Sequence, residues 1–334
     1  MAPAVLKNVQ ALRAVAALAV ALSHLVSFSP ALAVFSSGTI GVELFFVISG
    51  FIMVHITNDR EQRPVDFLAH RVVRVVPLYW LLTLAVFALA WLAPQLLKST
   101  QADPLELIKS LLFIPYVKHG TTLQPLLFQG WTLNFEMVFY LLFAASLFLR
   151  GQVLRVALVS LVIVLAVAVG QIFAPLSPVA GFYTSPLTLC FALGMGLGLA
   201  YPKINGALVG VALGAFVLLA AGTGAGVLTG TAAYLVRVAF AFAAVTAALA
   251  LEQRGQIWDW RPIQLLGAAS YSLYLIHPFA AIAIEKLARK FGLLDGAMLG
   301  VMLVVAMAAM IATGLALYRL IELPLQRVGR RLLA

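Results

Sequence analysis

Long apolar runs recur along the whole chain and constrain its fold more than any other feature. An α-helix needs roughly 20 apolar residues to cross the hydrocarbon core of a bilayer. Only 10% of the 334 residues are charged, against about 25% in an average globular domain. We therefore predict an all-α, polytopic membrane helix bundle with about ten transmembrane helices. The predicted spans lie near residues 9–28, 40–57, 76–97, 131–149, 153–173, 185–201, 205–223, 230–251, 270–288 and 297–318.

The basic residues between these runs predict the orientation of the bundle. With the amino terminus in the cytoplasm, 15 of the 22 Lys and Arg residues fall on the cytoplasmic side, six fall on the outer side, and Arg237 lies within a span. The positive-inside rule then predicts that both termini are cytoplasmic. This topology accounts for the net charge of +10, so we expect no nucleic-acid partner.

The connections are too short for a separate soluble domain. Only residues 98–130 form a long outer loop, in which we expect Asp103 to Pro115 to form a short interfacial helix. Three other outer connections, near 29–39, 174–184 and 222–229, carry no charge, and no internal repeat of fixed period is visible. We expect residues 1–334 to form a single integral-membrane domain with no appended soluble domain.

The first span carries two polar residues, Arg13 and His24, in an otherwise apolar sequence. Eleven positions are about three helical turns, so both side chains should point the same way, about 16 Å apart. Ionisable groups in a membrane helix usually face a protein interior or an aqueous cavity. In the alternative interpretation, Arg13 is a cytoplasmic flank and His24 is a packing residue.

Two carboxylates are predicted near the depth of His24. Glu43 and Glu136 each lie a few residues into a span that starts from the outer side. A carboxylate beside a histidine orients the ring and stabilises its protonated form, as in many general bases. The alternative for either glutamate is a solvated carboxylate at the membrane surface. Tyr140 lies one turn after Glu136 on the same face.

A cluster of arginines is predicted at the cytoplasmic surface. Arg71 and Arg74 are three residues apart, on one helix face just before the third span, and Arg13 joins them. Guanidinium groups suit phosphate oxygens. The alternatives are ordinary topological anchoring or contact with lipid head groups. Tyr79 would by default belong to an interfacial aromatic belt.

The carboxyl-terminal third contributes three further polar candidates. Tyr274 and His277 lie on a helix that enters from the inner side, so His277 should sit at a different depth from His24, as a substrate-channel or structural group. Glu322, with Pro324, closes the last span. It is either part of a helix stop or the partner of an arginine.

These parts fit one chemistry. A phosphorylated carrier could dock from the cytoplasm and present an acyl group near His24, where an acceptor hydroxyl would meet it. His24 would either remove the hydroxyl proton or carry the acyl group itself. The sequence leaves both modes open. We expect no metal site.

Six motifs in order carry a resemblance to a known family: Arg13-X10-His24, GVELFFVISGF, HRVVRVVPLYW, WTLNFEMVFY, YSLYLIHPF and IELP. From Leu6 to Pro324 the chain resembles the membrane acyltransferase 3 family, which O-acylates bacterial surface polysaccharides. Within it, the chain is most similar to rhizobial exopolysaccharide O-acetyltransferases. The resemblance implies acetyl-CoA as a co-substrate with no permanently bound cofactor. It also implies a polysaccharide or lipid-linked oligosaccharide as acceptor, and a multi-pass protein of the bacterial inner membrane.

The resemblance also implies roles for particular residues. Arg13 and His24 match the family's essential pair, Arg71 and Arg74 match its cofactor-binding arginines, with Tyr79 beside them, and Glu136 matches the glutamate of WTL-x-x-E. Glu43 stands where many relatives have aspartate. The candidates for a substrate-binding or structural polar role are Glu43, Ser49, Trp131, Asn134, Tyr140, Tyr274, His277 and Glu322.

Other functions compete with this prediction. Intramembrane Arg, His and Glu also serve transporters and flippases of sugar-containing substrates, although the absence of repeats disfavours that class. A receptor or scaffold leaves the polar pattern unexplained. A lipid-linked glycosyltransferase lacks the paired acidic motif that would hold a metal. The sequence leaves open acetyl against succinyl or another short acyl group, the acceptor sugar and its side of the membrane, and association into homo-oligomers.

Overall fold

The computed structural model describes residues 5–29, 32, 40–57, 62–97, 100–118, 122–173, 175, 177–224 and 231–333. The connections predicted near 29–39 and 222–229 lie mostly outside these ranges. The chain divides into two units, each built from separated segments. The first unit comprises residues 1–56 and 193–319, and the second comprises 57–192 and 320–334. The prediction of one domain stays a prediction.

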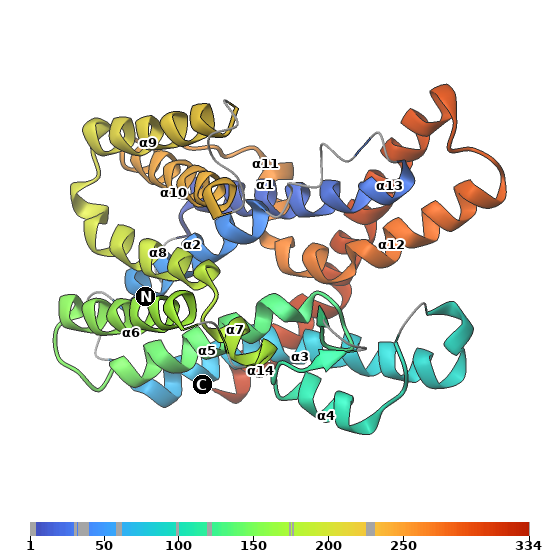
Figure 1. Ribbon diagram of the computed structural model, residues 1–334, viewed down its shortest axis with the longest axis horizontal. Helices are drawn as coiled ribbons and strands as arrows, with labels where there is room; N and C mark the ends of the chain where they lie inside the picture. The colour runs from blue at the N-terminus through green and yellow to red at the C-terminus, as the bar shows by residue number, and fades with distance from the viewer. Residues whose placement is uncertain are drawn as a thin grey trace. The chain divides into compact units, whose positions relative to one another are not determined.

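Helices make up the first unit (Figure 1). In Figure 1, α9 lies beside α10 and α12 pairs with α13. The amino end of α1 is held to the carboxyl end of α10, because the backbone N–H groups of Lys7 and Asn8 donate to the carboxylate of Glu252 at 3.0 and 2.6 Å. The elements are α1 (Lys7–Ser23), the 3-10 helix η1 (His24–Phe28), α2 (Ile40–Thr57), most of α8 (Leu189–Ala200), η5 (Tyr201–Lys203), α9 (Gly206–Gly224), α10 (Thr231–Gln253), α11 (Arg261–Ala268), α12 (Ser270–Lys290) and α13 (Gly296–Leu317).

Close backbone approaches hold this unit together. A Cβ on Gly194 of α8 would lie 2.1 Å from the carbonyl oxygen of Val47 on α2. A Cβ on Gly267 of α11 would lie 2.0 Å from the carbonyl oxygen of Gln10 on α1. Small residues at such crossings let membrane helices pack backbone against backbone, which compensates for the missing hydrophobic drive between helices in lipid.

The second unit is also helical, with one short hairpin. The segment predicted as an interfacial helix forms α4, whose first turn is capped by the Asp103 carboxylate accepting from the backbone of Leu105 and Glu106. Stacked aromatic rings fill its core, including Phe139 on Phe191 with centroids 4.3 Å apart. The elements are α3 (Pro64–Leu92), η3 (Pro94–Leu96), α4 (Pro104–Leu111), β1 (Val117–Lys118) paired antiparallel with β2 (Thr122–Leu123), α5 (Gly130–Ser146), α6 (Gln152–Ile172), α7 (Pro178–Tyr183), η4 (Pro186–Thr188) and α14 (Leu323–Leu332).

The all-α polytopic class is confirmed. Among the described residues, seven helices are long and apolar enough to cross a membrane, or eight if α11 and α12 count as one bent span. Two further predicted spans, 131–149 and 205–223, correspond to shorter helices: α5 with 17 residues, and Gly206–Leu218 of α9. The total of about ten spans and the cytoplasmic position of both termini stay predictions.

Two helix boundaries differ from the prediction. The third span starts at Pro64 rather than near residue 76, because Pro64 suits the first turn and the following residues continue the helix through Pro77. The last span does not stop at Pro324. After α13 a π-helical turn, η6 (Tyr318–Glu322), leads into α14, and Pro324 occupies the first turn of α14, where a missing N–H is tolerated.

Candidate active site

Arg13 and His24 of the first unit both lie against α12. The Arg13 guanidinium donates from Nη2 to the hydroxyl of Ser270, the first residue of α12, at 2.9 Å. Eleven residues later, His24 begins η1, and its Nδ1 lies 3.2 Å from Nε2 of His277, also on α12. The two polar groups of the first span therefore contact one neighbouring helix, as their helical spacing predicts.

The two imidazole rings form a pair in which His277 is buried and His24 is half-buried. Their centroids are 4.6 Å apart and their planes meet at 80°, an edge-to-face arrangement. The His277 side chain is fully buried, and its Nδ1 lies 3.1 Å from the carbonyl oxygen of Leu273. The elements that carry the pair, with α13, also form an apolar cluster that includes Ala21, Phe28 and Met310. Low local polarity strengthens the hydrogen bonds inside it.

The prediction that His277 lies at a different depth from His24 is wrong. It assumed that α12 starts level with the amino end of α1. Instead α11 is bent by 80° from α12, and α12 starts beside the guanidinium of Arg13, six residues into α1. Two helical turns after Ser270, His277 therefore reaches His24.

Glu43 pairs with an arginine. Its Oε1 accepts from Nε of Arg237 on α10 at 2.9 Å, and the Glu43 side chain is only 3% exposed. The interpretation of Glu43 as a solvated carboxylate at the membrane surface is therefore wrong. The other carboxylate oxygen, Oε2, is buried without a hydrogen-bond partner. Arg237 also lies over the ring of Tyr234, at 5.4 Å from its centroid.

Two other predicted polar residues lie within this unit. Ser49 is buried on α2, two residues before Phe51, on which the ring of His55 stacks with centroids 5.4 Å apart. Tyr274 is buried on α12, with its ring centroid 6.1 Å from that of His277. Tyr274 therefore belongs to the surroundings of the histidine pair.

In the second unit, Arg71 of α3 is a half-buried cation that has more hydrogen-bond donors than partners. Its Nε and Nη1 are buried and have no hydrogen-bond partner. Arg74, Glu136 and Tyr140 interact with it electrostatically, and its guanidinium lies 5.7 Å from the centroid of the Phe67 ring. Two guanidinium groups and one carboxylate leave one positive charge uncompensated among these side chains. Such an excess favours an anionic ligand.

Glu136 is held by its own helix. The hydroxyl of Tyr140, one turn further along α5, donates to its Oε1. The prediction that these two side chains share a face is confirmed. His24 and Glu43 belong to the first unit and Glu136 belongs to the second, so the shared depth of the three stays a prediction.

Three further candidates of the second unit, Tyr79, Trp131 and Asn134, lie on α3 and α5. Tyr79 is fully buried, stacks on Phe113 with centroids 4.8 Å apart, and packs on Gly130. This burial contradicts its interpretation as a residue of an interfacial aromatic belt. Asn134 is buried with an unpartnered Oδ1, and Trp131 of the same helix, half-buried, packs edge-on against Phe135.

Glu322 lies in the π-helical turn η6 and is buried. Its Oε1 accepts from Nε2 of Gln326, one turn further on, at 2.9 Å. A helix stop was one of its two interpretations, and the continuing helix excludes it. The other, a pairing with an arginine, stays a prediction.

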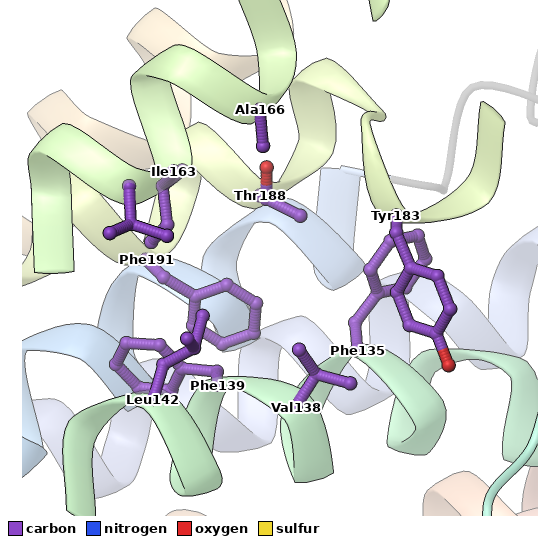
Figure 2. Close-up of a pocket in the computed structure, with 10 residues that line it drawn as sticks. Phe135, Val138, Phe139, Leu142, Ile163, Ala166, Tyr183, Thr188 and Phe191 are labelled. Carbon is purple, nitrogen blue, oxygen red and sulfur yellow. The ribbon is translucent and has the colours of Figure 1, made fainter. Parts of the chain in front are cut away.

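The second unit also contains a small apolar pocket between α5, α6 and the segment that leads into α8 (Figure 2). Figure 2 shows the rings of Phe135, Phe139 and Phe191 gathered around it, and Tyr183 and Thr188 also line it. The pocket has a volume of about 50 Å³ and no charged residue lines it. It is therefore suited to an apolar occupant and not to proton transfer.

Two titratable groups of residues 100–118 lie in buried positions. The Tyr116 hydroxyl lies 3.1 Å from that of Ser110, and burial raises the pKa of Tyr116 to about 12. The ammonium group of Lys118 donates to Thr100 at 2.9 Å, and burial lowers the pKa of Lys118 although nearby Glu106 opposes this. The first contact ties α4 to the residue before β1, and the second ties β1 to a residue before α4.

The comparisons with known proteins now bear on this arrangement. Residues 6–319 match the family described as Acyltransferase domain, the acyltransferase 3 family. The chain belongs to this family. It is 38% identical over 306 residues to the exopolysaccharide production protein ExoZ of Rhizobium meliloti (strain 1021). The matched region covers 89% of this chain and 92% of ExoZ. No solved structure matches.

Family membership makes the chain a multi-pass membrane enzyme that transfers acyl groups. Acyl transfer calls for a base or nucleophile and for groups that hold the donor. Histidine side chains can act as a base or nucleophile, and arginine side chains can bind an anionic donor. In the part of the chain that the structure describes, no group of three His, Cys, Asp or Glu side chains could hold a metal ion.

Sequence reasoning missed two partners in this acyltransferase. The sequence identified Arg237 only as a basic residue inside a predicted span. An arginine in a span usually pairs with a carboxylate, and in the structure its partner is Glu43. Ser270 was not singled out, because it is a small residue at the start of the apolar run that contains YSLYLIHPF; in the structure it accepts a hydrogen bond from Arg13. The histidine in that motif was identified, but its contact with His24 depends on the α11–α12 bend.

Proposed function

We propose that this acyltransferase moves a short acyl group, acetyl in the first instance, from cytoplasmic acyl-CoA to a hydroxyl of an exopolysaccharide sugar. The acceptor is the growing polymer or its lipid-linked precursor, and the site of action is the bacterial inner membrane. The family supports acyl transfer, and the name of the relative ExoZ supports an exopolysaccharide acceptor.

The observation that carries the choice of donor is the guanidinium of Arg71, whose Nε and Nη1 are buried. A buried charge without full compensation is costly, so its unpartnered Nε and Nη1 donors call for an anion. The phosphates of CoA are anions of the required kind, and arginine binds phosphate with charge-assisted hydrogen bonds. Arg74 adds a second positive charge, while Tyr140 holds Glu136 on the same helix.

His24 supplies the chemistry in this proposal. It is half-buried, and apolar side chains and a second imidazole surround it. A neutral imidazole in such surroundings can take the proton of the acceptor hydroxyl or attack the thioester itself. Arg13, hydrogen-bonded to Ser270, ties α1 to the start of α12 and so fixes the helix pair that carries both histidines.

The donor assignment is tested by calorimetry on the purified protein in detergent. CoA should bind, and pantetheine, which lacks the phosphates, should bind far more weakly. Arg71→Gln should weaken CoA binding by about 10- to 100-fold, because a hydrogen bond to a charged group contributes about 1.5–3 kcal/mol.

The matched control is Arg150→Gln, since Arg150 is exposed in the turn between α5 and α6. It should bind CoA as the wild type does. If folded Arg71→Gln binds CoA with wild-type affinity, Arg71 does not hold the donor. If folded wild-type protein binds no CoA, the acyl donor belongs to another chemical class.

A further inference from the structure

The contacts around the two histidine rings determine where their protons lie. Nδ1 of His277 lies 3.1 Å from the carbonyl oxygen of Leu273. The carbonyl of Tyr274, whose usual helical donor is missing at Pro278, is a further acceptor for this ring. A carbonyl oxygen only accepts, so Nδ1 of His277 carries a proton. In the neutral ring Nε2 is then an acceptor.

Nδ1 of His24 faces three acceptors. The first is Nε2 of His277 at 3.2 Å, and the second is the carbonyl oxygen of Val20 at 3.0 Å. The third is the hydroxyl oxygen of Ser23 at 3.5 Å, which gives its own proton to the Val20 carbonyl at 2.7 Å. Only a protonated Nδ1 satisfies these contacts. The neutral His24 ring therefore has its lone pair on Nε2.

We propose that His277 is a positioning residue of this enzyme, which together with the Val20 carbonyl holds His24 as the Nδ1–H tautomer so that Nε2 is its basic atom. The inference rests on the proposed function of His24 and adds the atom that acts and the partner that selects it. In many hydrolases a carboxylate fills this place. Here a neutral imidazole accepts the hydrogen bond instead.

The transfer step then follows with its protons accounted for. The acceptor oxygen bonds to the thioester carbonyl carbon while its proton passes to Nε2 of His24. The carbon–sulfur bond breaks, and the leaving thiolate takes that proton from Nε2. While His24 is an imidazolium, its Nδ1–H bond to Nε2 of His277 is charge-assisted and therefore stronger. If His24 carries the acyl group itself, the same lone pair on Nε2 is the nucleophile.

The surroundings favour this role over simple packing. A packing residue at position 277 needs only the right volume. His277 is fully buried, yet both of its ring nitrogens have hydrogen-bond partners: a backbone carbonyl at Nδ1, and Nδ1–H of His24 at Nε2. A buried polar network of this kind is stabilising only when every member is satisfied. Leucine fills a similar volume without an acceptor, and glutamine has an acceptor oxygen at a similar reach.

Nitrogen NMR of histidine-labelled protein in nanodiscs tests the tautomer without any substrate. The chain has five histidines, so spectra of His24→Ala and His277→Gln assign the two signals. At neutral pH the wild type should show a protonated Nδ1 and an unprotonated Nε2 for His24. A proton on Nε2 of His24 would overturn the proposal, whether or not the protein transfers acyl groups.

Kinetics on variants test the consequence. His277→Leu should lower kcat by about 10- to 100-fold with little change in the KM for acyl-CoA, as is typical when the partner that orients a histidine is lost. His277→Gln should recover most of the lost kcat. His70→Leu, at an exposed position of α3, is the control and should behave as the wild type.

Equal kcat values for folded His277→Leu and wild type would overturn the positioning role. The positioning role would also be overturned if His277→Gln and His277→Leu folded equally well and lost kcat to the same extent. If the wild type showed the expected tautomer but no transfer from any acyl-CoA, the proposed function would fail while the tautomer assignment stood.

Discussion

Removing Arg237 should destabilise the protein far more than removing both members of its ion pair. The Glu43 side chain is 3% exposed and the Arg237 side chain is 31% exposed, so Arg237→Met leaves a carboxylate in apolar surroundings. Breaking a buried pair from one side costs about 3–5 kcal/mol. Because Arg237 is partly exposed, we expect about 3 kcal/mol, a factor of about 100 in the unfolding equilibrium.

The assay is a double-mutant cycle in detergent micelles. Unfolding is followed by circular dichroism for Arg237→Met, Glu43→Leu and the double variant, each beside the wild type. The double variant should recover most of the loss seen in Arg237→Met, because two apolar side chains of similar volume are often tolerated at a buried pair. Arg150→Gln, with its exposed side chain, should lie within about 0.5 kcal/mol of the wild type. A double variant as unstable as Arg237→Met, or an Arg237→Met without measurable loss, would refute the reasoning.

Two other predictions follow from packing and burial. Gly194→Ala should destabilise the protein by about 1–3 kcal/mol, because its Cβ would lie 2.1 Å from the Val47 carbonyl oxygen; Gly196→Ala, on the same helix with open space, should stabilise it by about 0.5–1 kcal/mol. The same micelle unfolding assay checks both, and equal effects would contradict the packing. Burial raises the pKa of Tyr116 to about 12, so stability should fall as pH rises above the ordinary tyrosine value near 10. Tyr116→Phe should flatten this alkaline loss in a pH series of unfolding curves, and an unchanged slope would contradict it.

The sequence predicted the helices better than their contacts. Apolar runs located α2, α6, α10, α12 and α13 to within a few residues, because length and hydropathy alone decide which segments span a membrane. The spacing of Glu136 and Tyr140 also predicted that they share a helix face, where the structure shows a hydrogen bond between them. Local periodicity suffices for such pairs.

Pairs on different helices needed information that the sequence does not display. Glu43 and Arg237 are 194 residues apart, and nothing local specifies which carboxylate a lone arginine will meet. The contact between His24 and His277 depends on the 80° bend before α12, which the apolar pattern did not reveal because α11 is short and amphipathic. The π-helical turn before α14 was not predicted, because a proline such as Pro324 usually indicates that a helix ends.

The central claim is acyl transfer from acyl-CoA with His24 in the chemistry. Its most direct test measures the transfer of radiolabelled acetyl from acetyl-CoA to exopolysaccharide oligomers by purified protein in nanodiscs, with His24→Ala and His70→Ala in parallel. The account predicts labelled oligosaccharide from the wild type and from His70→Ala, and retained CoA binding without transfer in His24→Ala. Wild-type rates of transfer by His24→Ala would contradict it.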